Sequence, residues 1–166
     1  MPSKVAVVLQ FYDELSEEFA RDSEFLPAGG WAKRFSAALS NSLSTLEPHR
    51  AVMRAVLPVL VADPVYGLIA DKTSFSRVRV QGVFREAVEG ATNAPEERMA
   101  GALGNLLYVA HLGVILWWLL DRSPAQAATR GLVSLLESLG GLASASLWLP
   151  GTKRPILTLD SLVRSG

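Results

Sequence analysis

The stretch Met99–Leu120, MAGALGNLLYVAHLGVILWWLL, decides the fold, because it carries no formal charge over its whole length. A helix that is apolar on every side must lie inside protein or inside lipid. Glu96 and Glu97 suit the positive end of such a helix, and Arg122 lies near the negative end. We therefore expect a helix over 94–120, about 40 Å long at 1.5 Å per residue.

The residues after Leu120 predict a tight turn into a second helix. Ser123 can act as an N-cap, Pro124 suits the first helical position, and Gln126 can complete a capping box with Ser123. A helix over 124–143 follows, because a leucine stripe continues at helical spacing: Leu132, Leu135, Leu136, Leu139 and Leu142. Since the turn is so short, the two long helices should be antiparallel neighbours.

The rest of the chain also shows helical periodicity, interrupted by proline and glycine. The apolar spacing predicts helices over 3–22, 31–46 and 73–88. Pro48 opens a further helix, which Pro58 should end or kink because proline removes a backbone donor.

Two weaker signals complete the helical pattern. Asn93 and Glu96 resemble a capping pair for the long helix, and a short last helix is expected over 156–163. The sequence contains no internal repeat, low-complexity tract or interdomain linker. We therefore expect residues 1–166 to form one all-α domain.

The composition favours a globular protein that buries some of its surface against a partner. Of the 166 residues, 49% are hydrophobic and 19% are charged, and the 16 basic residues balance the 16 acidic ones. This balance gives no general attraction to nucleic acid or to an acidic membrane. Arg77, Arg79 and Arg85 give the 73–88 helix a basic side, which we interpret as a solvated face. The apolar excess suggests an interface.

The absence of cysteine and the N-terminal residues indicate the cellular compartment of the protein. The chain has no cysteine, so it has neither a disulfide framework nor thiolate chemistry, which fits a reducing cytoplasm. The apolar run at 5–9 is too short for a signal peptide, and acidic residues follow it. We expect a cytoplasmic protein.

Motifs of enzymes are missing from the sequence. His49 and His111 lie far apart and form no i, i+4 pair for a metal. No Gly-x-Ser-x-Gly elbow occurs, and the Asp71–Thr73 segment lacks the glycines of a phosphate-binding loop. We therefore predict no catalytic activity, no cofactor and no bound metal.

Two short segments resemble transcriptional regulators of the TetR type. Pro2-Ser3-Lys4 before an amphipathic helix resembles the join between the DNA-binding headpiece and the regulatory domain of that family. The run Leu120-Asp121-Arg122-Ser123-Pro124, with Gln126, Thr129 and Arg130, resembles the turn between the two long helices in some members. Val5 departs from the acidic residue that is frequent there, and the helix-turn-helix headpiece is absent from this chain.

The resemblance implies an orthogonal multi-helix regulatory domain that dimerises and binds an effector. The helices over 95–120 and 124–143 would form a four-helix bundle with those of a second subunit. A small, largely apolar effector would bind in a cavity enclosed by the first five or so helices. DNA would be contacted only through the missing headpiece, whose separation the effector would change.

The long helix itself has two apolar sides, as a helix shared between its own domain and a partner requires. We assign the side with Tyr108 and His111 to the effector pocket, because polar groups orient ligands in apolar sites. The predicted pocket residues are Trp31, Phe35, Phe84, Asn105, Tyr108, His111 and Ile115. The predicted dimer interface contains Leu106, Val109, Gly113, Leu116, Leu120, Leu132, Leu135, Leu136 and Leu139. A plain core role for the aromatic residues and His111 is the alternative.

Two further hypotheses about the whole chain remain open. It could be a small membrane protein that spans the bilayer at 99–120, although Asn105 and His111 would then lie in hydrocarbon. It could also be a free-standing helical small-molecule-binding protein or an antirepressor. A helix-turn-helix encoded just upstream of Met1 would separate this last hypothesis from a regulator.

Overall fold

The computed structural model describes residues 4–62, 73–146, 151 and 153–165. These residues form helices and contain no strand, which confirms the predicted all-α class. The residues Pro2-Ser3 of the TetR-like join lie outside the described part. The helices are α1 (Lys4–Asp22), α2 (Trp31–Leu46), α3 (Arg50–Ala62), α4 (Ser74–Glu89), α5 (Glu97–Leu120), α6 (Ala127–Ser146) and α7 (Lys153–Ser165), with short 3-10 helices η1 (Glu47–His49) and η3 (Pro124–Gln126).

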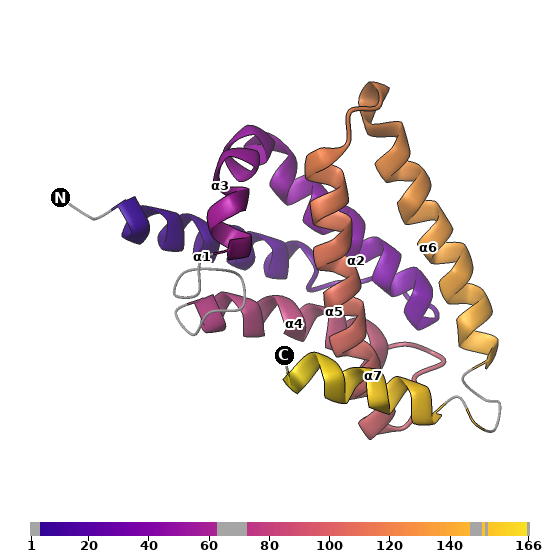
Figure 1. Cartoon of the computed structure of the whole chain (residues 1–166). Coiled ribbons are helices and arrows are strands. Elements are labelled where there is room, and N and C mark those ends of the chain that lie inside the picture. Colours follow the sequence, from indigo (N-terminus) through magenta and orange to yellow (C-terminus); the bar gives the residue numbers. More distant parts are fainter. Residues whose placement is uncertain (1–3, 63–72, 147–150, 152, 166) are drawn as a thin grey trace.

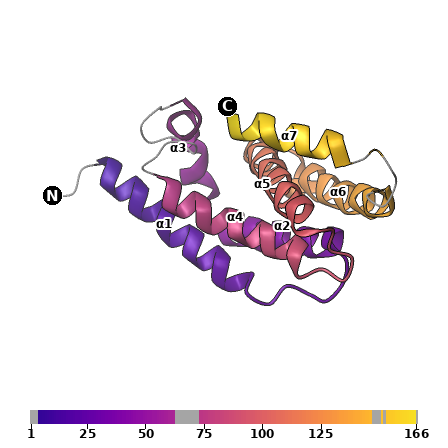
Figure 2. The same cartoon turned by 90° about the horizontal axis from the view of Figure 1, so that it is seen from below.

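The long helix α5 is the centre of the arrangement. It contacts α2, α3, α4, α6 and α7, and it crosses α1 and α4 steeply (Figure 1). Helix α4 packs between α1 and α5, whereas α7 lies across α5 on the side away from α1 (Figure 2). Helix α6 returns antiparallel to α5 and packs mainly on α2.

Two glycines allow the closest helix contacts in the domain. A Cβ atom on Gly104 of α5 would lie 2.9 Å from the Cα atom of Arg85 on α4. A Cβ atom on Gly140 of α6 would lie 2.9 Å from the Cβ atom of Ala32 on α2. Because real Cβ atoms do not approach other atoms so closely, glycine sets the spacing of α4 against α5 and of α6 against α2.

The buried core consists of two apolar clusters that meet along α5. The larger one joins α1, α2, α4 and α5 around Phe35, Leu39 and Phe84. The smaller one joins the start of α3 to the end of α5 around Met53, Trp118 and Leu119. Together the clusters bury one side of α5 along most of its length.

The turn between α5 and α6 is short, as predicted, but its capping is different. Gln126 makes no capping box with Ser123; its side chain accepts a hydrogen bond from Trp118 and donates one to Glu47. Ser123 does cap α6, because its hydroxyl oxygen accepts a hydrogen bond from the Ala128 amide at 2.9 Å. Asp121 caps the helix as well, accepting hydrogen bonds from the amide and hydroxyl of Thr129 at 2.9 and 2.6 Å. The helix begins at Ala127 rather than 124, because Gln126 and the residue before it have positive φ angles.

One other local prediction is wrong, and a second is wrong in one of its two alternatives. Asn93 does not cap the long helix, which begins at Glu97; its side-chain oxygen accepts a hydrogen bond from the backbone N–H of Trp31, at 2.9 Å, and so caps α2. Gly30 precedes Trp31 and has no side chain that could do this. Pro58 does not end α3, which continues to Ala62.

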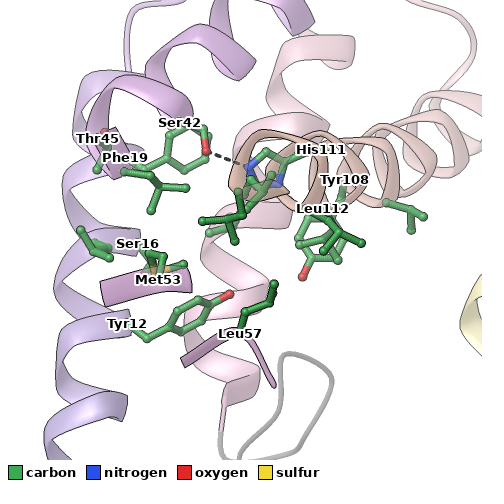
Figure 3. A pocket seen from close by; sticks show the side chains of 18 residues that line it. Tyr12, Ser16, Phe19, Ser42, Thr45, Met53, Leu57, Tyr108, His111 and Leu112 are labelled. Carbon is green, nitrogen blue, oxygen red and sulfur yellow. Dashed lines mark hydrogen bonds between the residues drawn. The ribbon is translucent and has the colours of Figure 1, made fainter. Parts of the chain in front are cut away.

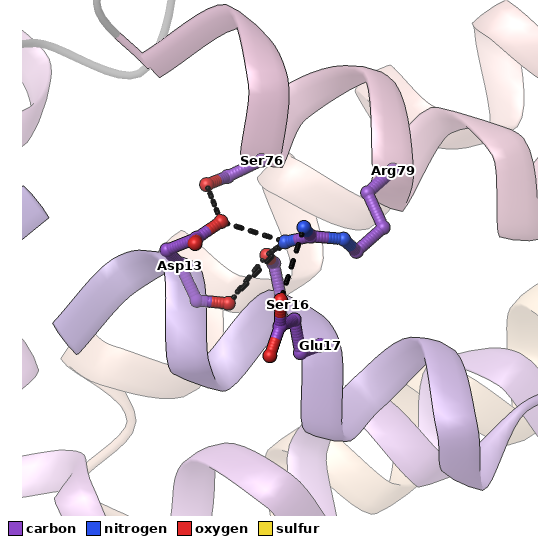
Figure 4. A network of polar contacts seen from close by, with 5 residues as sticks. All are labelled: Asp13, Ser16, Glu17, Ser76 and Arg79. Atoms are coloured by element: carbon purple, nitrogen blue, oxygen red, sulfur yellow. Dashed lines mark hydrogen bonds and ion pairs between the residues drawn. The ribbon is translucent and has the colours of Figure 1, made fainter. Parts of the chain in front are cut away.

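The predicted solvated basic face of α4 is only partly solvated. Arg85 pairs with Glu89 on its own exposed surface. Arg79, in contrast, reaches α1, where it binds the Asp13 carboxylate at 2.7 Å and also contacts Ser16 and Glu17 (Figure 4). The hydrogen bond from Arg79 holds the pKa of Asp13 below its usual value. Arg79 therefore ties α4 to α1.

Helix α5 also has the length and composition of a membrane-spanning segment. Among the described residues, Glu97–Leu120 passes this test, with 44% of its most apolar window buried inside the domain. Helices at the core of a protein pass the same test. Its contacts with α2, α3, α4, α6 and α7 are those of such a central helix.

Candidate ligand cavity

A cavity of about 370 Å³ lies between α1, α2, α3, α4 and α5 (Figure 3). This volume is within the range of small-molecule sites, roughly 300–1,000 Å³. Most of its wall is aliphatic or aromatic, with a few hydroxyls and one imidazole. The wall is formed by Tyr12, Leu15, Ser16, Phe19, Ser42, Thr45, Leu46, Met53, Leu57, Val80, Tyr108, Val109, His111, Leu112, Gly113, Ile115, Leu116 and Leu119.

His111 is a buried ionisable group of the wall. Only 4% of its surface is exposed, and Nε2 lies 2.8 Å from the hydroxyl of Ser42 on α2. The imidazole also contacts the rings of Phe19 and Phe84, with centroids 6.0 and 4.6 Å away. Because burial removes water from the charged form, the pKa of His111 falls to about 3. The side chain is therefore neutral at pH 7.

Two phenols lie in the same wall, one on each side of the cavity. Tyr12 projects from α1 and Tyr108 from α5, and both side chains line the pocket (Figure 3). Burial raises the pKa of Tyr108 to about 12. Burial, and then the neighbouring Tyr108, raise the pKa of Tyr12 above its ordinary range. Both phenols therefore keep their protons at physiological pH.

Several polar atoms of the wall have no hydrogen-bond partner among the residues that the structure describes. They are the hydroxyl oxygens of Thr45 and Tyr108 and the Nδ1 atom of His111. Buried polar groups are paired in most proteins, so an unpaired one requires an explanation. Three such atoms therefore belong to residues that line the same cavity.

The structure brings three of the seven predicted pocket residues to this cavity. Tyr108, His111 and Ile115 line it. Phe84 lies behind the His111 ring, and Phe35 packs edge-on against Phe84 with centroids 5.8 Å apart. Both are fully enclosed core residues outside the wall.

The other two predicted pocket residues stabilise contacts between helices. Trp31 is buried at the start of α2, where its ring faces Gly140 of α6. Asn105 donates a hydrogen bond of 2.9 Å to Asp160 of α7. Neither belongs to the cavity wall. Residue type alone suggested a pocket role for both, whereas their neighbours from α6 and α7 are distant in the sequence.

Sequence analysis missed the contribution of the first three helices to the wall. Tyr12 and Phe19 come from α1, Ser42 and Thr45 from α2, and Met53 from α3. The regular apolar stripes of α1 and α2 mark their buried sides, but they do not separate a core position from a cavity position. The hydroxyls on these buried sides were the available signal, because buried hydroxyls require partners.

The side of α5 opposite the core is apolar and exposed over its second half. Val109, Leu116 and Leu120 are exposed there, and so are Leu135 and Leu139 of α6, all five of them predicted interface residues. Leu106, Leu132 and Leu136 are half-buried, and Gly113 is exposed. The exposed residues Trp117 and Leu142 belong to the same two helices and were not predicted. We call these apolar residues of α5 and α6 the outer face.

Three residues of the outer face also line the cavity, which the sequence assignment did not foresee. Val109, Gly113 and Leu116 are exposed and contribute to the wall. They therefore lie at the mouth of the cavity, between its interior and the outer face. The two sides of α5 meet at these residues.

Comparisons with known proteins do not extend these assignments: no protein-family model matches the sequence, and no curated protein matches it significantly. Within the described residues there is also no cluster of three or more His, Asp or Glu side chains suited to a metal ion. The cavity and the outer face therefore carry the functional interpretation.

Proposed function

We propose that this chain is the small-molecule-sensing and dimerisation domain of a TetR-type transcriptional regulator. The cavity between α1 and α5 would hold an effector, and α5 and α6 would form a four-helix bundle with a second copy. Any effect on DNA would pass through a headpiece outside this chain. The proposal includes no catalysis, metal or cofactor.

One observation carries the proposal: α5 has a cavity with unpaired polar groups on one side and an uncovered apolar face on the other. A ligand that favours one position of α5 would also favour one geometry of a dimer built on α5 and α6. This coupling is what a sensing domain requires. Val109, Gly113 and Leu116 belong to both surfaces, so the two events would share residues.

Sedimentation of the purified chain tests the dimer. We expect a dimer at micromolar concentration, and the double variant Leu135→Lys/Leu139→Lys should be monomeric. In a symmetric interface both copies carry both new charges, and like charges brought together cost several kcal/mol. We expect the dissociation constant to rise at least about 100-fold, with little change in the melting temperature of the monomer.

The control for this test is Ser44→Lys, which adds one lysine charge to the exposed side of α2. It should sediment like the wild type. A wild-type chain that stays monomeric at tens of micromolar would refute the dimer.

A free-standing helical binding protein or antirepressor is the alternative, and the cavity suits it equally well. The two differ in what the gene encodes next to this domain. A reading frame that continues upstream of Met1 into a helix-turn-helix supports the regulator, whereas a stop codon and start site directly before Met1 favour the alternative.

A further inference from the structure

We propose that the cavity selects an uncharged, mostly apolar molecule with one oxygen acceptor, such as a ketone, and that this oxygen accepts a hydrogen bond from the Tyr108 hydroxyl. This inference rests on the proposed ligand-sensing function and names the class of ligand. Tyr108 is thereby a specificity-determining residue.

The wall of the cavity argues against a charged ligand. As far as the structure describes it, the wall contains no Lys, Arg, Asp or Glu side chain. Its one histidine, His111, is neutral because burial lowers its pKa to about 3. A carboxylate or an ammonium group would lose its water here, and no wall residue offers it an opposite charge; Arg77 of α4 acts on Tyr12 and Tyr108 from outside the wall.

The Tyr108 hydroxyl argues for an oxygen acceptor. Tyr108 is only 4% exposed and lines the cavity, and its hydroxyl has no partner within the described part of the chain. Its phenol is a hydrogen-bond donor at neutral pH, because burial raises its pKa to about 12. An acceptor on the ligand would satisfy a donor that otherwise stays unpaired, whereas a pure hydrocarbon would leave it so.

His111 reinforces this preference. Nδ1 is unpaired, while Nε2 lies 2.8 Å from the Ser42 hydroxyl. When Ser42 donates to Nε2, the imidazole proton is on Nδ1, which is then a further unpaired donor on α5, as the Tyr108 hydroxyl is. Unpaired donors at the wall favour a ligand that carries an acceptor.

The size of the cavity restricts the ligand further. Its volume of about 370 Å³ is near the lower end of the range for small-molecule sites. One bicyclic aromatic body with a short substituent suits this space, and the aromatic and aliphatic wall suits its surface.

Three probes of one shape test the proposal: 2-acetonaphthone, 2-ethylnaphthalene and 2-naphthoate. They carry a ketone, a hydrocarbon and a carboxylate on the same body. Binding to the full chain is measured by fluorescence titration at pH 7.5. We expect the ketone to bind at least about tenfold more tightly than the carboxylate, because the wall offers the anion no counter-charge.

The variant Tyr108→Phe assigns the hydrogen bond. It should weaken binding of the ketone about 5- to 10-fold, the usual effect of one hydrogen bond, and leave the hydrocarbon within about twofold. Thr45→Val is the matched control, because it removes another unpaired hydroxyl of the wall and keeps the shape. We expect a smaller loss of ketone affinity than in Tyr108→Phe; an equal loss would assign the hydrogen bond to Thr45 and contradict the role of Tyr108. Thermal melts show that both variants are folded.

The carbonyl stretching frequency of the bound ketone gives a second readout. It should shift to lower frequency in the wild type and less in Tyr108→Phe, because a hydrogen bond weakens the C=O bond. Two outcomes would overturn this inference and leave the sensing function standing. In one, Tyr108→Phe weakens the binding of the ketone and of the hydrocarbon equally; in the other, the carboxylate binds as tightly as the ketone. If none of the probes binds, the ligand-sensing function fails with it.

Discussion

The two sides of α5 have similarly apolar sequences and very different surroundings. On the inner side, Trp118 is fully buried between η1 and η3, where its indole N–H donates to Glu47 and Gln126. On the outer side, the neighbouring Trp117 is 51% exposed. These two adjacent tryptophans therefore differ in their exposure to solvent.

An apolar sequence therefore does not by itself distinguish a side of a helix that is buried in the core from a side that is exposed. The N-terminal half of α5 is covered on its outer side by α7, through the hydrogen bond between Asn105 and Asp160 and the ion pair between Glu96 and Lys153. The C-terminal half has no such cover within the described residues. The comparison therefore predicts different consequences for equal substitutions on the two sides.

The largest contrast is expected between Trp118→Ala and Trp117→Ala. Removing the buried indole of Trp118 should lower the free energy of unfolding by about 3–5 kcal/mol, because a large cavity remains and Glu47 loses one of its donors. Removing Trp117 should cost about 1 kcal/mol or less. Urea denaturation measures both values.

Both tryptophan substitutions are made in the double variant Leu135→Lys/Leu139→Lys, which is expected to be monomeric. In a monomer, the contribution of Trp117 to a dimer is absent, so the two tryptophans are compared within one subunit. Similar losses for the two variants would contradict the distinction between an inner and an outer side.

Alanine substitutions at two glycines of α5 should change the stability of the domain in opposite directions. Gly104→Ala should destabilise the domain by about 1–3 kcal/mol, because its Cβ atom would lie 2.9 Å from the backbone of Arg85. Gly101→Ala should stabilise it by up to about 1 kcal/mol, because no atom lies within 4 Å and alanine favours the helix. The denaturation midpoints of the two variants should lie on opposite sides of the wild type. If Gly104→Ala were more stable than the wild type, the space between α4 and α5 would be large enough for an added Cβ atom.

Much of the fold was predictable because it depends on local patterns. Helical spacing and breaking residues placed the long helix at 94–120, against the observed Glu97–Leu120, and the first helix at 3–22, against Lys4–Asp22. The errors arose where residues distant in sequence meet. Asn93 caps α2 and not the helix that follows it, which no local pattern shows.

The candidate site was less predictable for the same reason. Tyr108 and His111 were identified because polar groups are rare on an apolar helix. Val109 and Leu116 were assigned to the interface alone, although they also line the cavity. Periodicity indicates toward which side of a helix a side chain points. It does not show whether the side chains of neighbouring helices fill the space there or leave a cavity.

The smallest contrast concerns pH and compares His111 with His49, the other histidine of the chain. An unfolded histidine has a pKa of about 6.5, whereas burial holds the pKa of His111 at about 3. Between these values the unfolded state binds more protons, so the free energy of unfolding decreases as the pH falls. The loss should approach about 1.4 kcal/mol per pH unit below 6.5, or about 2 kcal/mol between pH 8 and pH 5.

Substitution shows which histidine causes this dependence. His111→Gln should make the free energy of unfolding nearly independent of pH between 8 and 5, while His49→Gln, on η1 against Phe11, should keep the wild-type slope. The carboxylates with lowered pKa, Asp13 and Asp121, lose their contribution only below about pH 4, where unfolded carboxyl groups begin to bind protons. An unchanged slope in His111→Gln would mean that water reaches the imidazole, and the inner side of α5 would then resemble the outer one.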